Sequence, residues 1–68
     1  MGIIITVNGK KETIEENTRI SDFLALKKLN PDKVVVEYNQ DILNRENFEN
    51  SVLWENDVLE ILRIVGGG

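Results

Sequence analysis

The sequence predicts a small α+β domain in which one helix covers one face of a mixed β-sheet, and three observations predict it. The chain has 68 residues, a length that supports a single domain over 1–68 with one small core. Apolar runs typical of strands stand at residues 3–7, 34–38 and 58–65. Apolar residues at helical spacing stand between the first two runs, at 20–29. One helix buries the apolar face of such a sheet against one core.

The first strand is expected at Ile3–Val7 and is followed by Asn8-Gly9. This dipeptide is typical of a tight hairpin turn, because both residues accept a positive φ. The returning strand is expected at Lys10–Glu16, and its charged residues suit an edge of the sheet. Glu15 and Glu16 would point to opposite faces of that strand, so a solvated edge is favoured over a pair of catalytic carboxylates.

A helix of about two to three turns is expected next. Thr18 is the candidate N-cap, and Asp22 lies favourably in the first turn. The helix should end near Asn30, because Pro31 disfavours helix in the residue before it. The apolar stripe, which we expect to pack on the sheet rather than bind a partner, consists of Ile20, Phe23 and Leu24, closed by Leu26 or Leu29.

The second half of the chain predicts three further extended segments. They are a strand at Val34–Tyr38, a short strand or turn at Ile42-Leu43, and a final strand at Val58–Val65. Between them, Arg45–Asn50 is expected to form one helical turn or loop with Phe48 turned inward, and Val52-Leu53-Trp54 to lie against the core. The first and last strands are expected to be neighbours. This order of elements is that of the β-grasp, or ubiquitin-like, fold.

Side-chain alternation divides the final strand into two faces. Leu59 and Ile61 are assigned to the core, because Glu60 places a charge on the other side. A register shifted by one residue would reverse this assignment. On our assignment the open face is an apolar docking surface edged by acids, formed by Val58, Glu60, Leu62 and Ile64 with Val35 and Glu37 of the neighbouring strand, and continued by Val65 and Gly66.

The composition narrows the possible functions. The chain contains neither cysteine nor histidine, so it has no thiolate nucleophile, no Ser-His-Asp arrangement and no expected metal site. Catalysis by its own side chains is therefore not expected. The net charge of −4 disfavours nucleic acid and suits a basic partner. No apolar run is long enough to span a membrane, and the absence of cysteine agrees with a cytoplasmic location.

The chain ends in three glycines, residues 66–68, directly after an apolar strand. Glycine has no Cβ, so residues 65–68 are expected to form a thin, flexible C-terminal tail that ends in a carboxylate. Fully extended, three residues reach about 10 Å. The alternative is a frayed end or a remnant of an expression vector.

Five segments carry the pattern of a known family, and they are Val7–Lys10, Thr18–Leu24, Val36–Asn39, Arg45-Glu46 and Asn56–Gly68. In this order they resemble the ThiS-type sulfur carriers of thiamine biosynthesis. The resemblance covers essentially the whole chain, with one departure at Asn56, where the family usually has glycine. Asparagine tolerates the left-handed conformation that such a turn requires.

The resemblance implies a carrier that is acted on by other enzymes and binds no cofactor itself. The Gly68 carboxylate would be adenylated with ATP and Mg²⁺ by a relative of ubiquitin-activating enzymes (ThiF type). A persulfide, ultimately charged by a cysteine desulfurase, would convert it to a thiocarboxylate, which gives its sulfur to thiazole synthase (ThiG type). Gly67 would let the tail thread into the active sites of these partners.

Three other functions fit the same residues. One is the related sulfur carrier that forms the small subunit of molybdopterin synthase, which shares the fold and the Gly-Gly end. Another is a ubiquitin-like modifier joined through Gly68 to lysines of other proteins. The third, of a different class, is a structural β-grasp interaction module whose glycine end has no role.

Overall fold

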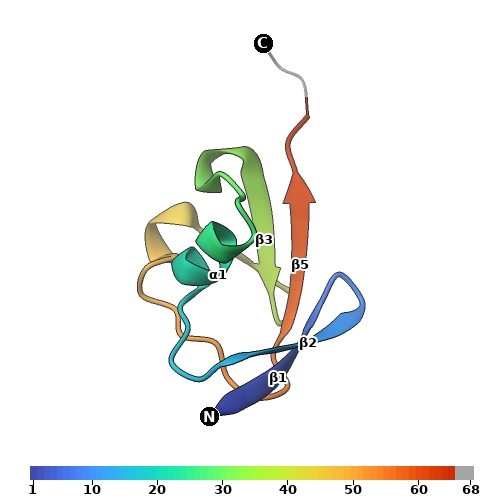
Figure 1. The fold of residues 1–68 in the computed structure, drawn as a ribbon. Helices are drawn as coiled ribbons and strands as arrows, with labels where there is room; N and C mark the ends of the chain where they lie inside the picture. The colour runs from blue at the N-terminus through green and yellow to red at the C-terminus, as the bar shows by residue number, and fades with distance from the viewer. Residues whose placement is uncertain (66–68) are drawn as a thin grey trace.

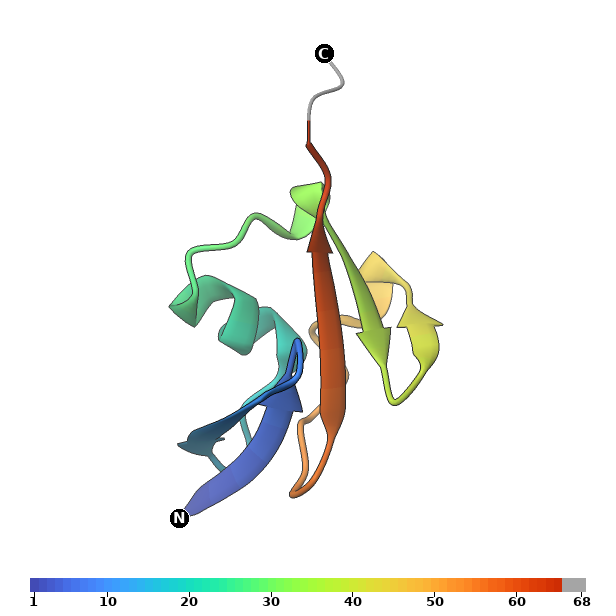
Figure 2. The same cartoon turned by 90° about the vertical axis from the view of Figure 1, so that its right-hand side faces the viewer.

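The computed structural model describes residues 1–65, which form a five-stranded mixed sheet with one α-helix packed on one face (Figure 1, Figure 2). The strand order is β2-β1-β5-β3-β4, so the predicted β-grasp arrangement is confirmed. The elements are β1 (Gly2–Val7), β2 (Lys10–Glu15), α1 (Ile20–Leu26), β3 (Val34–Tyr38), β4 (Asp41–Leu43) and β5 (Val58–Arg63), with 3-10 turns at Pro31–Lys33 and Arg45–Asn47.

The first hairpin forms as predicted. β1 and β2 pair antiparallel, from Gly2 opposite Glu15 to Val7 opposite Lys10. Both residues of the connecting turn have positive φ, 51° at Asn8 and 82° at Gly9. This geometry matches the right-handed twist of the strands, which is why the Asn-Gly dipeptide closes the hairpin here.

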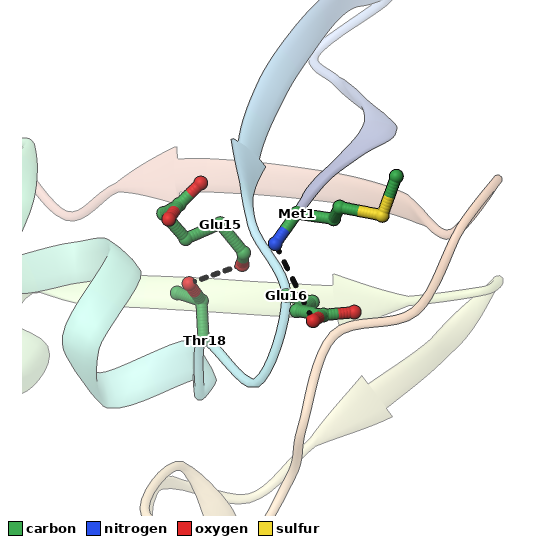
Figure 3. Close-up of polar contacts among 4 residues, drawn as sticks. All are labelled: Met1, Glu15, Glu16 and Thr18. Carbon is green, nitrogen blue, oxygen red and sulfur yellow. Dashed lines mark hydrogen bonds and ion pairs between the residues drawn. The ribbon is translucent and has the colours of Figure 1, made fainter.

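Glu15 and Glu16 have structural roles at the end of this hairpin (Figure 3). The carboxylate of Glu16 lies 3.3 Å from the N-terminal ammonium of Met1. The main-chain oxygen of Glu15 accepts a hydrogen bond of 2.6 Å from the Thr18 hydroxyl. These contacts agree with the predicted solvated edge rather than with a catalytic pair.

The prediction that Thr18 caps the helix was wrong. Its hydroxyl is committed to Glu15, and its carbonyl accepts from the N–H of Leu53 at 2.8 Å, so the helix begins one residue later. Arg19 is the N-cap residue, and its N–H donates to the carboxylate of Asp22 at 3.2 Å. Asp22 thus supports the first turn, as predicted. The position of the cap itself is set by the tertiary contacts of Thr18.

The helix also ends earlier than the predicted limit near Asn30. It stops at Leu26, because Lys28 adopts a φ of 58° and the chain turns back. The N–H of Leu29 then donates to the Leu24 carbonyl at 2.9 Å, which is the main bond of a Schellman motif. Leu29 therefore completes the apolar stripe, whereas Leu26 is 71% exposed.

The segment after β4 is partly as predicted. A single 3-10 turn places Phe48 in the core, and Leu53 is fully buried. The expectation that Trp54 lies against the core was wrong, because its side chain is 64% exposed. Trp54 opens the tight turn that leads into β5, and Asn56 takes the left-handed conformation there, with a φ of 71°. The departure from glycine at Asn56 is thus tolerated, as expected.

The core lies between α1 and the sheet. Within residues 1–65, no helix is both long enough and apolar enough to cross a membrane. The prediction of one domain over 1–68 also includes Gly66–Gly68, which lie outside the described residues. The core side chains come from β1, α1, β3, the segment between β4 and β5, and β5, and are Ile5, Val7, Ile20, Phe23, Leu24, Val34, Val36, Phe48, Leu53, Leu59 and Ile61.

Candidate functional site

The candidate site is built on β5, the strand that precedes the C-terminal tail. β5 lies between β1, to which it is parallel, and β3, to which it is antiparallel. Leu59 and Ile61 are buried against α1, while Val58, Glu60 and Leu62 face away from it. The assignment of the two faces is therefore confirmed, and a register shifted by one residue is excluded.

The open face of β5 carries the predicted apolar surface. Leu62 lies opposite Val35 of β3, and both side chains are on the face away from the helix. Leu62 is 58% exposed and Ile64 52%, so much of their apolar surface meets water. Ile64 follows the end of β5, and its N–H still donates to the carbonyl of Lys33 at 2.7 Å. This bond keeps the chain aligned with the sheet for one residue beyond β5. The next residue, Val65, is almost fully exposed.

Two carboxylates lie side by side within this surface. Glu37 of β3 is directly opposite Glu60 of β5. Like charges in directly opposite positions destabilise a sheet by a few tenths of a kcal/mol to about 1 kcal/mol. The position of the two carboxylates therefore does not stabilise the fold of this chain. Their negative charge suits a cationic group on a partner.

Sequence reasoning missed two residues of this face, Ile4 and Ile42. Ile4 is on the face opposite to the buried Ile5, and Ile42 of β4 pairs with Glu37. Both side chains are exposed, so the apolar surface extends toward both edges of the sheet. Alternation within β1 signals Ile4, but Ile42 is found only once the β3–β4 register is known.

The start of β5 is held on its β3 side by side chains from two turns. Asn39 has a φ of 49°, and its side-chain carbonyl accepts from the N–H of Val58 at 2.9 Å. Its own N–H donates to the Val58 carbonyl at 2.8 Å. The carboxylate of Asp57 accepts from the Tyr38 hydroxyl at 2.6 Å and from the N–H of Trp54 at 2.7 Å. The turn before β5 is thereby fixed to the end of β3.

This arrangement raises the pKa of the Tyr38 hydroxyl. Burial raises the pKa of Tyr38 from its ordinary value of 10.0 to about 12, and the hydrogen bond to Asp57 and the negative charge of Asp57 act in the same direction. The hydroxyl therefore stays protonated and continues to donate to the Asp57 carboxylate through the neutral range.

The middle of β5 is held on its β1 side by Asn8. The Asn8 N–H donates to the Leu59 carbonyl at 2.9 Å. Its side-chain oxygen accepts from the Ile61 N–H at 2.7 Å, and its side-chain N–H donates to the Ile61 carbonyl at 3.3 Å. The amide therefore replaces a strand at the point where β1 turns away into the hairpin.

The predicted reactive residues are the C-terminal glycines. Gly66, Gly67 and Gly68 lie outside the described residues, so their predicted roles stay predictions. Within residues 1–65, no three acidic side chains are grouped to hold a metal ion. The described part of the chain has an exposed apolar face and a strand, β5, that is paired with β1 and β3.

Comparisons with known proteins identify the relatives of the chain. The model of the ThiS family matches residues 2–68. The chain is 36% identical over 66 residues to the sulfur carrier protein ThiS of Bacillus subtilis, which spans 96% of this chain and 100% of that protein. The crystal structure of thiamine biosynthesis protein ThiS from Geobacter metallireducens has a TM-score of 0.81 and 36% identity, covering 97% of this chain and all of that chain.

A stretch of a larger protein is also similar. The chain is 33% identical over 64 residues to the thiazole synthase of Magnetococcus marinus. The match covers 94% of this chain and 20% of that protein. In that bacterium, a segment similar to this chain is therefore part of a polypeptide named as a thiazole synthase.

Proposed function

The chain belongs to the ThiS family, the sulfur carriers of thiamine biosynthesis, and we propose that it carries sulfur as a thiocarboxylate at Gly68. The carriers of this family work with thiazole synthase. The observation that carries the proposal is the position of β5. This central strand is held on both sides as far as Ile61, and it directly precedes the end of the chain that carries the glycines.

The proposed chemistry uses only the C-terminal carboxylate of this chain. An α-carboxyl has a pKa of about 3.5, so the tail is ionised at neutral pH and its oxygen can attack the α-phosphorus of ATP. Pyrophosphate leaves, and the acyl-adenylate that remains is a far better acceptor than the carboxylate. The outer sulfur of a persulfide then displaces AMP to give an acyl disulfide. A second thiol breaks its S–S bond and forms a disulfide with the inner sulfur, and the thiocarboxylate is released. The absence of cysteine and histidine is compatible with a chain that supplies no catalytic side chain.

Three kinds of partner are part of the proposal. An adenylyltransferase of the ThiF type would bind ATP and Mg²⁺ and activate Gly68. A cysteine desulfurase, directly or through another persulfide donor, would supply the sulfur. Thiazole synthase would then accept it. A cytoplasmic location, where these enzymes would meet the chain, is part of the same proposal.

The open face of β5 is the proposed docking surface for these partners. Its centre is apolar, at Val35 and Leu62, and its two carboxylates, Glu37 and Glu60, call for a basic group opposite them. Ile64 and Val65 continue the surface to the tail. Gly66 and Gly67 would then provide a segment thin enough to enter a narrow active site.

The proposal is tested by measuring the intact mass of the chain. The chain is incubated with ATP, Mg²⁺, a cognate adenylyltransferase and a sulfide donor. We expect the mass change of one oxygen replaced by sulfur, located at Gly68 by fragmentation. The variant Gly67→Val should fold like the wild type but release at least about a hundredfold less pyrophosphate per unit time, since misplacing a reacting group by a small distance costs this much.

A matched control is Ala25→Val, which also introduces a valine, but at an exposed position of α1 on the other side of the sheet from the docking surface, and which should adenylate normally. Normal pyrophosphate release by Gly67→Val would contradict the proposed role of the tail. Attachment of the chain to lysines of other proteins would indicate a modifier instead. Consumption of the thiocarboxylate by a molybdopterin synthase large subunit, and not by thiazole synthase, would indicate the molybdenum pathway.

A further inference from the structure

The last part of β5 has a main-chain edge with no neighbouring strand. Main-chain groups of a strand alternate in direction, and on the β1 side those of Leu59 and Ile61 both bond to Asn8. The N–H and C=O of Arg63 come next in this alternation and face the same side. Among residues 1–65, no strand or side chain bonds to them, because β5 runs on past the β1–β2 hairpin (Figure 1, Figure 2).

A hollow of about 380 Å³ adjoins this open edge on the helix side of the sheet. It lies between the β1–β2 hairpin, the end of α1 and β5. Its apolar wall includes Phe23, Leu29 and Ile61. The size and lining suit one or two apolar side chains of a segment that lies along the edge.

The charged residues around the hollow are mainly cationic. Lys10, Lys27 and Arg63 line it, with Glu12 as the single acid among its lining residues. Glu12 is already paired with Lys27, at 2.6 Å. Within residues 1–65, Lys10 and Arg63 form no ion pair. In a chain whose net charge is −4, this is a local site of positive charge.

We propose that an extended segment of thiazole synthase adds to β5 as a strand at Arg63, with an apolar side chain in the hollow and a carboxylate against Lys10 and Arg63. Main-chain bonds to an open strand edge give affinity, and the alternate side chains give specificity. A free anion would use the positive charge but would leave the N–H and C=O of Arg63 without a strand. This surface is on the opposite side of the sheet from the apolar open face.

Two observations favour thiazole synthase as the occupant. Arg63 is separated from Gly66 only by Ile64 and Val65, so this edge is close in sequence to the end that thiazole synthase would receive. In Magnetococcus marinus a segment similar to this chain belongs to a polypeptide named as a thiazole synthase, so the two are parts of one molecule there. This inference rests on the proposed function, in which thiazole synthase takes the sulfur from the tail.

The first test measures amide hydrogen exchange by NMR, with the full chain free and bound to thiazole synthase. The N–H of Arg63 should exchange rapidly in the free chain and at least about tenfold more slowly in the complex, as expected for a new main-chain hydrogen bond. The N–H of Ile64 already bonds to Lys33 and is the internal control, since it is protected in both states.

The second test compares two substitutions at one position. Arg63→Ala removes the charge and should weaken binding to thiazole synthase by about fivefold, the upper range for an exposed charge. Arg63→Pro also removes the N–H, and should weaken binding by about a further tenfold. The fold does not use this N–H, and Leu62 before it is already extended, so proline is compatible with the strand.

Unchanged exchange at Arg63 in a complex of wild-type affinity would overturn the inference, and so would equal affinities for the two variants. Protection with the adenylyltransferase but not with thiazole synthase would overturn the choice of occupant. The NMR measurement decides the matter even if Arg63→Pro fails to fold. Failure of the proposed function is read separately, from the mass at Gly68, a reaction in which thiazole synthase takes no part.

Discussion

The two halves of β5 differ in how they are held. The first half, Val58–Ile61, has a neighbour on each side, with Asn39 and β3 on one and β1 and Asn8 on the other. The second half, Leu62 and Arg63, is paired with β3 alone. One strand thus combines a rigid anchor in the core with a segment that remains open to other proteins. The difference indicates that support of β5 from both sides ends at Ile61, and that beyond it only the β3 side of the strand is occupied.

The largest effect should come from comparing one leucine in each half. Leu59→Ala should lower the free energy of unfolding by about 2–5 kcal/mol, because Leu59 is fully buried and its removal leaves a cavity. Leu62→Ala should change it by less than about 0.5 kcal/mol, because this side chain is mostly exposed. Urea denaturation measures both.

The same pair should behave in the opposite way in binding. Leu62→Ala should weaken binding to the adenylyltransferase by about tenfold, as for a central apolar contact of an interface. Titration calorimetry gives this value. If Leu62→Ala destabilised the fold as much as Leu59→Ala, the open face would not be open and the comparison would fail.

A smaller effect should come from the amide that closes the first half. Asn8→Ala loses both side-chain bonds to Ile61 and puts alanine at a φ of 51°, a conformation that asparagine adopts more readily. We expect a loss of about 2–3 kcal/mol, from two hydrogen bonds of about 1 kcal/mol each and the left-handed conformation. Thermal and urea unfolding measure the loss.

Asn8→Gly is the matched control, because glycine accepts the positive φ and lacks only the amide. It should be destabilised by about 1–2 kcal/mol, and the Ile61 amide should exchange faster in both variants. Exchange at Ile61 that is unaffected by either substitution would show that Asn8 does not hold the strand.

The smallest effect should come from Tyr38→Phe, which frees the turn before β5 from one contact. The variant should be less stable by about 1 kcal/mol at neutral pH, through loss of the bond to Asp57. The pKa of Tyr38 is raised from 10.0 to about 12 in the folded chain, so its stabilising contribution is present below pH 10 and disappears as the pH rises through 12.

The difference in unfolding free energy between wild type and Tyr38→Phe should therefore shrink between pH 10 and pH 12. Urea denaturation at a series of pH values gives this difference, and the phenylalanine variant corrects for the lysines that titrate in the same range. A difference that stays constant up to pH 12 would show that the hydroxyl is not bonded to Asp57.

The features that local pattern determines were predictable from the sequence. Asn8-Gly9 specified the hairpin, and the charge of Glu60 between apolar neighbours specified which face of β5 is buried. Both signals lie within a few residues of the structure that they determine.

Features set by distant contacts were not predictable. The N-cap of the helix is Arg19 and not the predicted Thr18, because Thr18 bonds to Glu15 and Leu53. The bonds between Asn8 and Ile61 join residues 53 positions apart, and no local sequence pattern predicts them. The positive edge at Arg63 likewise depends on where β1 turns away, which requires the three-dimensional register.

The central position of β5 also has a consequence for the order of folding. The β1–β2 and β3–β4 hairpins are local and can form early. They are joined into one sheet only when β5, Val58–Arg63, pairs with both of them. Contacts between the two ends of a chain are slow to form, because a long loop must close first. A nascent chain that lacks β5 would hold two separate hairpins and an uncovered helix. The chain can therefore become folded only when β5, the strand that precedes its C-terminal glycines, has been made.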